Sequence, residues 1–263
     1  MKRVVSAPRR INPGALWEPW VATPLLLGMA EQFLGRPDEA LRLCDEALRR
    51  ASQLKNSFDL EQALIMAASV RRMRREPEAA RDLAEAARAL AEEHGFWVGS
   101  GVIAWAKAEL GQTEQALVEL ESRTDSANPF HAEILRPQVY MRVGRIELAL
   151  EILNQHLAQI ERLGAHQNEA EVYLLQGEAI LMRDPRATAA AENSFRKAIQ
   201  IAQGQSAKWW ELRATVSLAR LLANQGKRDA AHKMLAEIYD WFTEGFDLPD
   251  LKEAKALLDE LST

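Results

Sequence analysis

Six short turn-like segments recur along the 263-residue chain, and their spacing constrains the fold more than any other feature of the sequence. Measured at the second residue of each segment, the successive spacings are 40, 36, 33, 42 and 40 residues. The six residues at this position are Gly35, Arg75, Gly111, Gly144, Arg186 and Gly226. Such a period is typical of repeat proteins, in which each unit buries its apolar face only against its neighbours.

Alanine follows five residues after this position in all six units: Ala40, Ala80, Ala116, Ala149, Ala191 and Ala231. The residue nine positions after it is apolar in every unit: Cys44, Ala84, Leu120, Leu153, Phe195 and Leu235. Small residues at matching heights let two antiparallel helices approach closely, because the interaxial distance depends on the side chains at the contact. Each unit is therefore predicted to be a helix A, a turn and a helix B.

Composition agrees with helices, because Ala, Leu, Glu and Arg are abundant whereas only 13 glycines and 10 prolines occur. We predict an all-α fold, a right-handed α-solenoid of about six antiparallel helix pairs. Residues 1–16 are expected to be poorly ordered, and 17–263 to form a single helical-repeat domain. The expected units are 18–54, 58–93, 96–123, 129–163, 167–203 and 207–243, followed by a capping helix at 249–262.

The last stretch, residues 239–261, is predicted to end the sixth pair and to add the capping helix. Gly245 is expected to be the left-handed residue that ends helix B, with Trp241 and Phe246 in the apolar contact that accompanies a Schellman ending. Pro249 then begins a new helix. The apolar stripe expected to cover the end of the solenoid is Leu251, Ala254, Leu258 and Leu261.

The repeat pattern resembles the tetratricopeptide repeat, most closely in segments 37–48 and 191–199, which carry the alanine, the apolar residue and a second alanine at offset twelve. The spacing here exceeds that family's period of 34 residues in four of the five intervals. Most of the predicted A helices also lack the family's aromatic positions. The resemblance implies a tetratricopeptide-like array with lengthened, uneven helices.

Residues 208–261 resemble the C-terminal end of large bacterial regulatory ATPases of the signal-transduction (STAND) type, some of which also carry a class III nucleotide cyclase domain. The resemblance is strongest over about 170–261 and extends more weakly back to about Trp17. It implies that the chain is the repeat region of such a regulator, with a STAND-type ATPase or a nucleotide cyclase as the implied partner. The 263 residues include neither of those domains themselves.

Motifs for catalysis are missing from the sequence. It contains no G-x-x-x-x-G-K-[ST], no H-E-x-x-H and no cluster of Cys and His. The G-S-G-V-I-A at 99–104 matches a dinucleotide pattern, but its all-helical context favours close helix packing. Cys44 is expected to be a buried structural thiol, and the five histidines lone surface residues. We therefore expect no enzyme, no catalytic residue, no cofactor and no metal.

The net charge of −5 and the pI near 5.7 argue against a dedicated nucleic-acid-binding protein. A single cysteine is natural for a reducing compartment, and no apolar stretch is long enough to span a bilayer. We expect a cytoplasmic protein with neither nucleic acid nor membrane as its partner.

Two groups of side chains are candidates for partner binding. The first is the run RRMRR, whose arginines are Arg71, Arg72, Arg74 and Arg75. These arginines either stabilise the C-terminus of helix A in unit 2 or form a site for an anionic partner. The second is Trp209 and Trp210, which point about 100° apart on a helix. One of them is either a partly exposed interface anchor or part of extended packing within the repeat.

These observations predict a non-enzymatic scaffold whose concave face binds a protein or peptide, as a sensor or regulatory module of a bacterial signalling system. The alternative is a small-molecule-sensing module with a pocket inside the superhelix. A broad polar inner groove would favour the peptide, whereas an enclosed apolar pocket would favour the small molecule.

Overall fold

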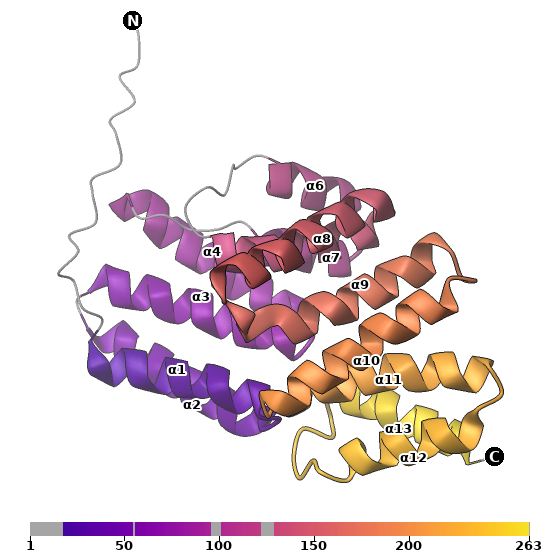
Figure 1. Cartoon of the computed structure of the whole chain (residues 1–263). Coiled ribbons are helices and arrows are strands. Elements are labelled where there is room, and N and C mark those ends of the chain that lie inside the picture. Colours follow the sequence, from indigo (N-terminus) through magenta and orange to yellow (C-terminus); the bar gives the residue numbers. More distant parts are fainter. Residues whose placement is uncertain (1–17, 55, 96–100, 122–128, 263) are drawn as a thin grey trace, which may run out of the picture.

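The structure, a computed structural model, describes residues 18–54, 56–95, 101–121 and 129–262. These ranges contain thirteen α-helices and a short 3₁₀ helix, with no strand among them, arranged as six antiparallel pairs and one further helix (Figure 1). The all-α solenoid of helix pairs is thereby confirmed. Residues 1–16, expected to be poorly ordered, lie outside the described ranges.

The helices have the following bounds: α1 Pro19–Phe33, α2 Pro37–Gln53, α3 Ser57–Met73, α4 Pro77–His94, α5 Gly101–Glu109, α6 Thr113–Glu121, α7 Pro129–Arg142, α8 Ile146–Leu163, α9 Glu169–Arg183, α10 Thr188–Gly204, α11 Lys208–Asn224, α12 Arg228–Tyr239 and α13 Pro249–Leu261. The 3₁₀ helix is His166–Asn168.

Close contact within each pair depends on the small residues of the repeat. All six alanines at offset five are completely buried. In the first pair, a Cβ added to Gly28 of α1 would lie 2.9 Å from the sulfur of Cys44 and 3.0 Å from the carbonyl oxygen of Ala40, both in α2. Even one methyl group more would push these helices apart, because protein interiors are close-packed.

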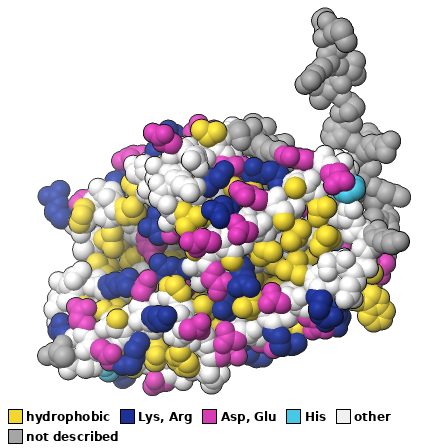
Figure 2. All heavy atoms as spheres, turned by 180° about the vertical axis from the view of Figure 1, so that it is seen from behind, with side chains coloured by type: hydrophobic (Ala, Val, Ile, Leu, Met, Phe, Trp, Pro, Cys, Tyr) yellow, Lys and Arg dark blue, Asp and Glu magenta, His cyan; other side chains and the backbone are white. Residues whose placement is uncertain are grey.

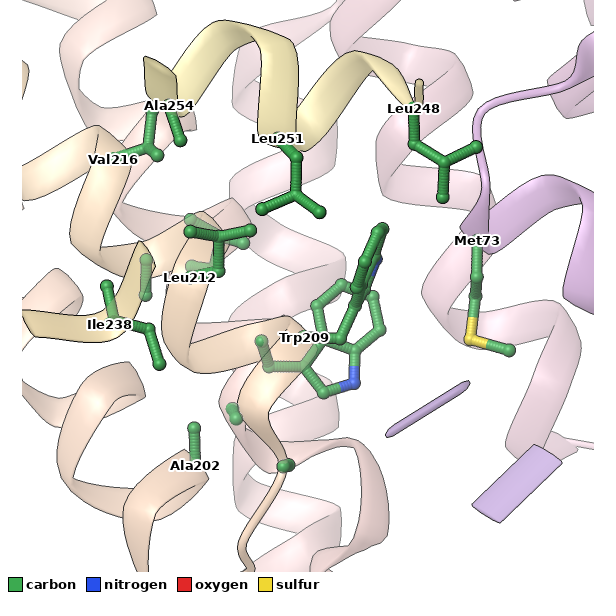
Figure 3. Close-up of a cluster of buried hydrophobic side chains, with 14 of the residues drawn as sticks. Met73, Ala202, Trp209, Leu212, Val216, Ile238, Leu248, Leu251 and Ala254 are labelled. Carbon is green, nitrogen blue, oxygen red and sulfur yellow. The ribbon is translucent and has the colours of Figure 1, made fainter. Parts of the chain in front are cut away.

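The A helices of successive pairs contact one another along the inside of the solenoid, and the B helices lie outside. The contacts run from α1 through α3, α5, α7 and α9 to α11, and α11 in turn contacts α1. In Figure 1 the C-terminal helices accordingly return beside α1 and α2. The first two pairs and the sixth share one apolar core, in which Met73 of α3 belongs to the same cluster as Trp209 of α11 and Leu248 (Figure 3). The solenoid is therefore closed into a ring.

The ring is joined by reciprocal hydrogen bonds between the loop after α12 and the N-terminus of α2. The backbone N–H groups of Asp38 and Glu39 donate to Oε1 of Glu244, at 2.9 and 3.2 Å. In return, the N–H of Gly245 donates to Oδ2 of Asp38, at 3.1 Å. The residue at the N-cap of α2, Arg36, makes no side-chain cap. A residue from the far end of the chain thus satisfies N–H groups that every helix leaves open at its first turn.

The end of the sixth pair differs from the expectation in two respects. Gly245 has a left-handed φ of +77°, as predicted, but it lies in the connecting loop because α12 already ends at Tyr239. The expected contact between Trp241 and Phe246 is also wrong, since Trp241 packs on Phe242, and Phe246 on Tyr239. The cause is tertiary: the loop adopts the path that places Glu244 over α2.

Helix α13 covers the sixth pair as expected. It contacts α11 and α12, and its predicted apolar stripe is buried: Leu251, Ala254, Leu258 and Leu261. Its first turn also reaches α3, where Glu253 pairs with Arg75 at 2.7 Å. The helix therefore both covers the last pair and links it to the second.

The loop between α12 and α13, residues 240–248, gives a first prediction. A Cβ at Gly245 would lie 2.4 Å from Cγ of Pro37, in addition to the strain of a left-handed backbone. We expect Gly245→Ala to lower the free energy of unfolding by roughly 2–3 kcal/mol. The matched control is Gly111→Ala, which has a similar φ of +76° but no atom within 4 Å of the added Cβ. It should lose only about 1 kcal/mol. Equal urea midpoints for the two variants would contradict the role assigned to the loop.

A buried carboxyl group in α3 gives a second prediction. Glu61 is buried and accepts a hydrogen bond from Nε2 of Gln62 at 2.7 Å. Burial raises the pKa of Glu61 from 4.5 to about 7, although the Gln62 hydrogen bond opposes the shift. Between these two pH values the folded state holds a proton that the unfolded state has lost. Stability should therefore fall as the pH rises through this window and then level off.

Replacing Glu61 by Gln should remove this pH dependence. At pH 8, Glu61→Gln should raise the free energy of unfolding by about 2 kcal/mol, with little change near pH 4.5. Urea unfolding at the two pH values measures the difference. Glu85→Gln, which alters an exposed carboxylate on the outer helix α4, is the control and should leave the pH dependence of the wild type intact. A parallel offset at both pH values would contradict the assignment to Glu61.

Candidate functional site

A cavity of about 310 Å³ lies inside the ring, lined by residues of α3, α5, α7, α9, α11 and α13. Figure 2 shows the hollowed face of the molecule, where arginine and carboxylate side chains gather between apolar ones. The apolar part of the wall includes Trp105, Met141, Leu174, Trp210 and Val216. The cavity is thus neither wholly polar nor wholly apolar.

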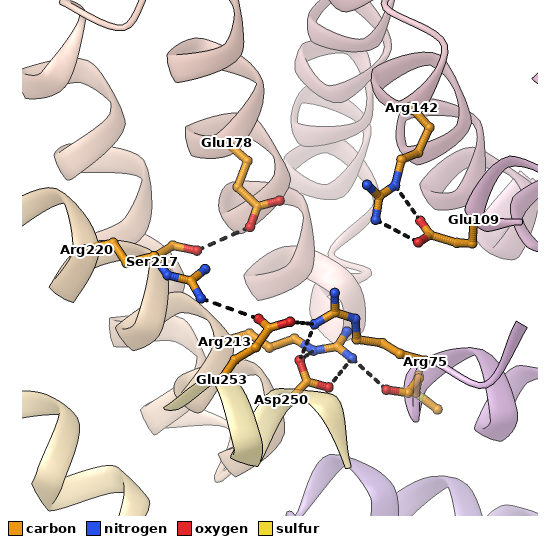
Figure 4. Close-up of polar contacts among 10 residues, drawn as sticks. Arg75, Glu109, Arg142, Glu178, Arg213, Ser217, Arg220, Asp250 and Glu253 are labelled. Carbon is orange, nitrogen blue, oxygen red and sulfur yellow. Dashed lines mark hydrogen bonds and ion pairs between the residues drawn. The ribbon is translucent and has the colours of Figure 1, made fainter. Parts of the chain in front are cut away.

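Five arginines and five carboxylates belong to the lining. The arginines are Arg72, Arg75, Arg142, Arg213 and Arg220, and the carboxylates are Glu109, Glu171, Glu178, Asp250 and Glu253. Two of the pairs are bidentate, in which the planar guanidinium makes two parallel hydrogen bonds. Arg213 reaches the two oxygens of Asp250 at 2.8 Å each, and Arg142 those of Glu109 at 2.7 and 2.6 Å (Figure 4).

Arg213 connects several helices. Its Nη2 also donates to the carbonyl oxygen of Met73 at 2.6 Å, at the C-terminus of α3. Its guanidinium lies over the rings of Trp209 and Trp210, 5.7 and 5.1 Å from their centroids. Burial alone would lower the pKa of Arg213, but the charge and hydrogen bonds of Asp250 outweigh it, and the pKa is raised. Arg213 therefore stays charged and holds α3, α11 and α13 together.

A second buried pair joins another set of helices that line the cavity. Nη1 of Arg72 donates to Oε1 of Glu171 at 3.0 Å, and Nε2 of Gln138 donates to the same oxygen at 3.0 Å. These contacts join α3, α9 and α7. Buried charges that are paired and hydrogen-bonded in this way fix the relative positions of their helices, because separating them would leave an uncompensated charge.

Glu178 differs from the other four carboxylates of the lining. Each of the other four carboxylates forms an ion pair within 4.0 Å. Among the ion pairs of the described residues, none includes Glu178. Its Oε1 accepts a hydrogen bond from Oγ of Ser217 at 3.2 Å. Burial raises the pKa of Glu178, against the opposing effects of Ser217 and of more distant arginines. In Figure 4 its carboxylate lies apart from the Arg213–Asp250 cluster.

The predicted arginine cluster is divided between two environments. Arg72 and Arg75 line the cavity. Arg71 points elsewhere and pairs with Glu76 at 2.7 Å. Arg74 is buried in the joint between the first two pairs, where it donates to the carbonyl oxygen of Pro37 at 2.7 Å. The four side chains therefore share no common face, because successive helical positions point in different directions.

Arg75 has an unusual backbone. Its φ is +60°, in the left-handed region, at the turn position that other units fill with Gly35, Gly111, Gly144 and Gly226. A non-glycine residue there is strained by roughly 1–2 kcal/mol. The side chain reaches Glu253 at 2.7 Å and Asp250 at 3.7 Å. A strained residue whose side chain enters a cavity is a candidate for function.

The two adjacent tryptophans are both buried, with exposures of 0% for Trp209 and 2% for Trp210. Of the two alternatives, the partly exposed interface anchor is therefore wrong, and packing holds. Helix α11 packs on α12 within the sixth pair and also contacts α1 of the first pair, so partners exist on both of its sides. Trp209 packs edge-on against Phe242, with centroids 5.9 Å apart, and Trp210 lies 6.5 Å from the ring of Phe33. Extended packing between repeats thus accounts for both, and Trp210 also lines the cavity.

The cysteine and one histidine also have defined environments. Burial raises the pKa of the Cys44 thiol to about 12, in agreement with the predicted structural role. The expectation that all histidines are surface residues is wrong for His156, which is 5% exposed and whose pKa burial lowers. His156 occupies offset twelve of its unit, on the face that α8 turns toward its neighbours. Within the described ranges, no three His, Cys, Asp or Glu side chains are grouped as metal ligands.

Most of the charged lining was not predicted from the sequence, although one sequence pattern indicates it. Glu171 and Glu178 are seven residues apart on α9, and Arg213 and Arg220 are seven apart on α11. Residues separated by seven positions share one face of a helix. Charges repeated at this spacing on otherwise apolar A helices indicate a polar stripe facing the inside of the ring.

Comparison with known proteins supports the repeat assignment. A family model described as the tetratricopeptide repeat matches residues 20–93, which cover the first two pairs. The chain therefore contains a tetratricopeptide-like repeat region. No curated protein matches the chain. The relation to STAND-type ATPases stays a prediction. Within the described part of the chain, no helix combines the length and apolarity of a membrane span.

Two solved structures match the chain. The structure of NprR in complex with its cognate peptide NprX is 14% identical with a TM-score of 0.57, covering 95% of this chain and 73% of that one. The TPR2AB-domain:pHSP90 complex of yeast Sti1 is 16% identical with a TM-score of 0.40, covering 92% of this chain and 98% of that one. At this identity the NprR likeness concerns the fold alone.

The backbone of Arg75 gives a third prediction. Arg75→Gly and Arg75→Ala both lose the ion pairs, but only glycine relieves the left-handed strain. We expect the glycine variant to be the more stable of the two by about 1 kcal/mol in urea unfolding. The control is Arg72, which has a helical backbone, so Arg72→Ala should be more stable than Arg72→Gly by a similar amount. If glycine and alanine have the same order of stability at both positions, the strain assigned to Arg75 is contradicted.

Proposed function

We propose that the chain is a non-enzymatic helical-repeat scaffold that binds a short peptide segment of a protein partner in the central cavity. The observation that carries this proposal is the mixed lining, in which charged side chains alternate with apolar ones inside the ring. A peptide offers both kinds of group along one chain, so such a wall matches it better than a purely apolar one would. The NprR structure, which holds the peptide NprX, has a similar fold.

The ion pairs of the lining favour binding because they hold the wall in place before a ligand arrives. Arg142 and Arg213 are each fixed by two hydrogen bonds to a carboxylate. Side chains that are already ordered lose less conformational entropy when a ligand binds. A peptide entering this cavity would therefore meet a preformed surface.

A specific observation favours the alternative of a small-molecule sensor. The cavity volume of about 310 Å³ lies at the lower end of the range typical of small-molecule sites, about 300–1,000 Å³. A short segment of a few residues fits such a space, and a long peptide does not. The two candidates are therefore a short peptide segment and a free small molecule of similar size.

The wider biological role is also part of the proposal. The resemblance of residues 208–261 to STAND-type regulators supports a sensor or regulatory module of a bacterial signalling system. On this proposal the module acts in the cytoplasm as a single domain over 17–263, and its partner is a STAND-type ATPase or a nucleotide cyclase. The absence of a P-loop motif from the sequence supports a module that does not hydrolyse nucleotides by itself.

The fourth prediction tests whether peptides bind in the cavity. Fluorescently labelled hexapeptide pools are titrated with the purified chain, and anisotropy is measured. Met182 is a partly exposed residue of the cavity lining, and Met182→Trp should obstruct the space and weaken binding at least about tenfold.

The matched control is Val118→Trp, which places the same side chain on the exposed surface of α6, outside the cavity. Val118→Trp should bind the pools as the wild type does. Binding that survives Met182→Trp, or that both variants abolish equally, would contradict the cavity as the site. Binding of a small-molecule library in the absence of any peptide binding would favour the alternative.

A further inference from the structure

We infer that the central cavity binds a zwitterionic ligand, whose cationic group pairs with Glu178 and whose carboxylate pairs with Arg220. The inference rests on the proposed function, because it assigns the ligand chemistry of the same cavity. It depends on which charged side chains of the lining form close ion pairs with each other and which do not.

Two of the lining pairs are complete in themselves. Arg72 is held by Glu171 at 3.0 Å, and Arg142 by both oxygens of Glu109. Each of these pairs contributes one positive and one negative charge in direct contact. Neither pair therefore has an unpaired charge that a ligand could bind.

The charges on the α13 side of the cavity are unequal. Three arginines there, Arg75, Arg213 and Arg220, share two carboxylates, Asp250 and Glu253. Asp250 is engaged bidentately by Arg213, and Glu253 lies closer to Arg75, at 2.7 Å, than to Arg220, at 3.5 Å. Arg220 is therefore the least satisfied cation of the group. About half of its side chain is exposed, so it is accessible to a ligand carboxylate.

Glu178 is the corresponding negative charge. It has the hydrogen bond from Ser217 and no ion pair within 4.0 Å among the described residues, and it lines the same cavity as Arg220. An ionised carboxylate accepts about four hydrogen bonds, so one bond from Ser217 leaves most of its capacity open. Burial raises the pKa of Glu178, as expected for a carboxylate that lacks solvent and a close counter-charge.

A ligand that carries both charges satisfies both groups at once. A cation alone would leave Arg220 weakly paired, and an anion alone would leave Glu178 unpaired in a partly desolvated site. Leaving a buried charge unpaired is costly, whereas a charge-assisted pair in such a site is about twice as strong as a neutral hydrogen bond. The cavity should therefore prefer ligands with one basic and one acidic group.

This chemistry has two sources, a peptide segment with a basic and an acidic residue, or a free zwitterion. The probes are four pools of acetylated, amidated hexapeptides in matched Ala/Leu backgrounds. The pools carry Lys and Glu, Lys and Gln, Gln and Glu, or two Gln. The free probe is 6-aminohexanoate, which has an ammonium and a carboxylate at the two ends of an alkyl chain. Binding is measured by anisotropy for the peptides and by calorimetry for 6-aminohexanoate.

We expect the wild type to bind the Lys/Glu pool about tenfold more tightly than any other pool. Glu178→Gln should lose the preference for Lys and keep the preference for Glu. Arg220→Gln should show the reverse. Glu178→Gln retains an oxygen for Ser217, so the fold should persist, and urea unfolding verifies this. Glu85→Gln and Arg196→Gln alter exposed charges on the outer helices α4 and α10 and should leave both preferences unchanged.

The outcomes separate this inference from the proposed function. If the peptide pools bind without any charge preference and Met182→Trp weakens that binding, the inference is overturned but the proposed peptide scaffold is supported. Binding of 6-aminohexanoate alone, lost in Glu178→Gln, would support the zwitterion site and overturn the peptide. Binding of neither the pools nor 6-aminohexanoate would overturn both.

Discussion

The close approach of the two helices in each pair is the constraint on which the rest of the structure depends. A completely buried alanine at one offset in all six pairs sets this distance, and Gly28 against Ala40 shows that no space is left for a methyl group. In a solenoid the small rotation between neighbouring units accumulates into the curvature of the whole. Here the accumulated curvature brings α11 back to α1, and the A helices enclose a cavity. A bulkier residue at the alanine offset would alter the ring and the cavity together.

Helix pairs were predictable because the signal for them is local and repeated. Alanines recur at the same offset in all six units and glycines at the turn in four of them, and both lie within the unit itself. The loop after α12 was not predictable in the same way. Its path is set by Glu244 binding the N-terminus of α2, whose residues lie more than 200 positions earlier in the chain. Local rules for helix ends placed Gly245 correctly in the left-handed region but assigned it to the wrong structural element.

The candidate site was predictable only in part, for a related reason. Arg72 and Arg75 were candidates for partner binding because they belong to a local run of arginines. The carboxylates that pair with them lie 99 and 178 residues away in the sequence. Nothing in a run of four arginines indicates which two side chains turn inward. Of the two alternatives for the tryptophans, the exposed anchor was wrong for a different reason. Adjacent positions point about 100° apart on a helix, but ring closure places Phe33 beside Trp210 while Phe242 packs on Trp209, so both lie in one core.

The charges inside the ring support the proposed binding function more than they support stability. Replacing a buried ion pair by well-packed apolar residues is often neutral or stabilising, so apolar contacts could fix the same helices at no loss of stability. Arg75 departs from a stability optimum as well, because it occupies a left-handed position that four other units fill with glycine. The strained backbone and the unequal arginine–carboxylate group meet on the same side of the cavity, around Asp250 and Glu253. These two departures from the most stable arrangement share Arg75 and lie on one wall of the cavity, which supports the proposal that this wall binds a ligand.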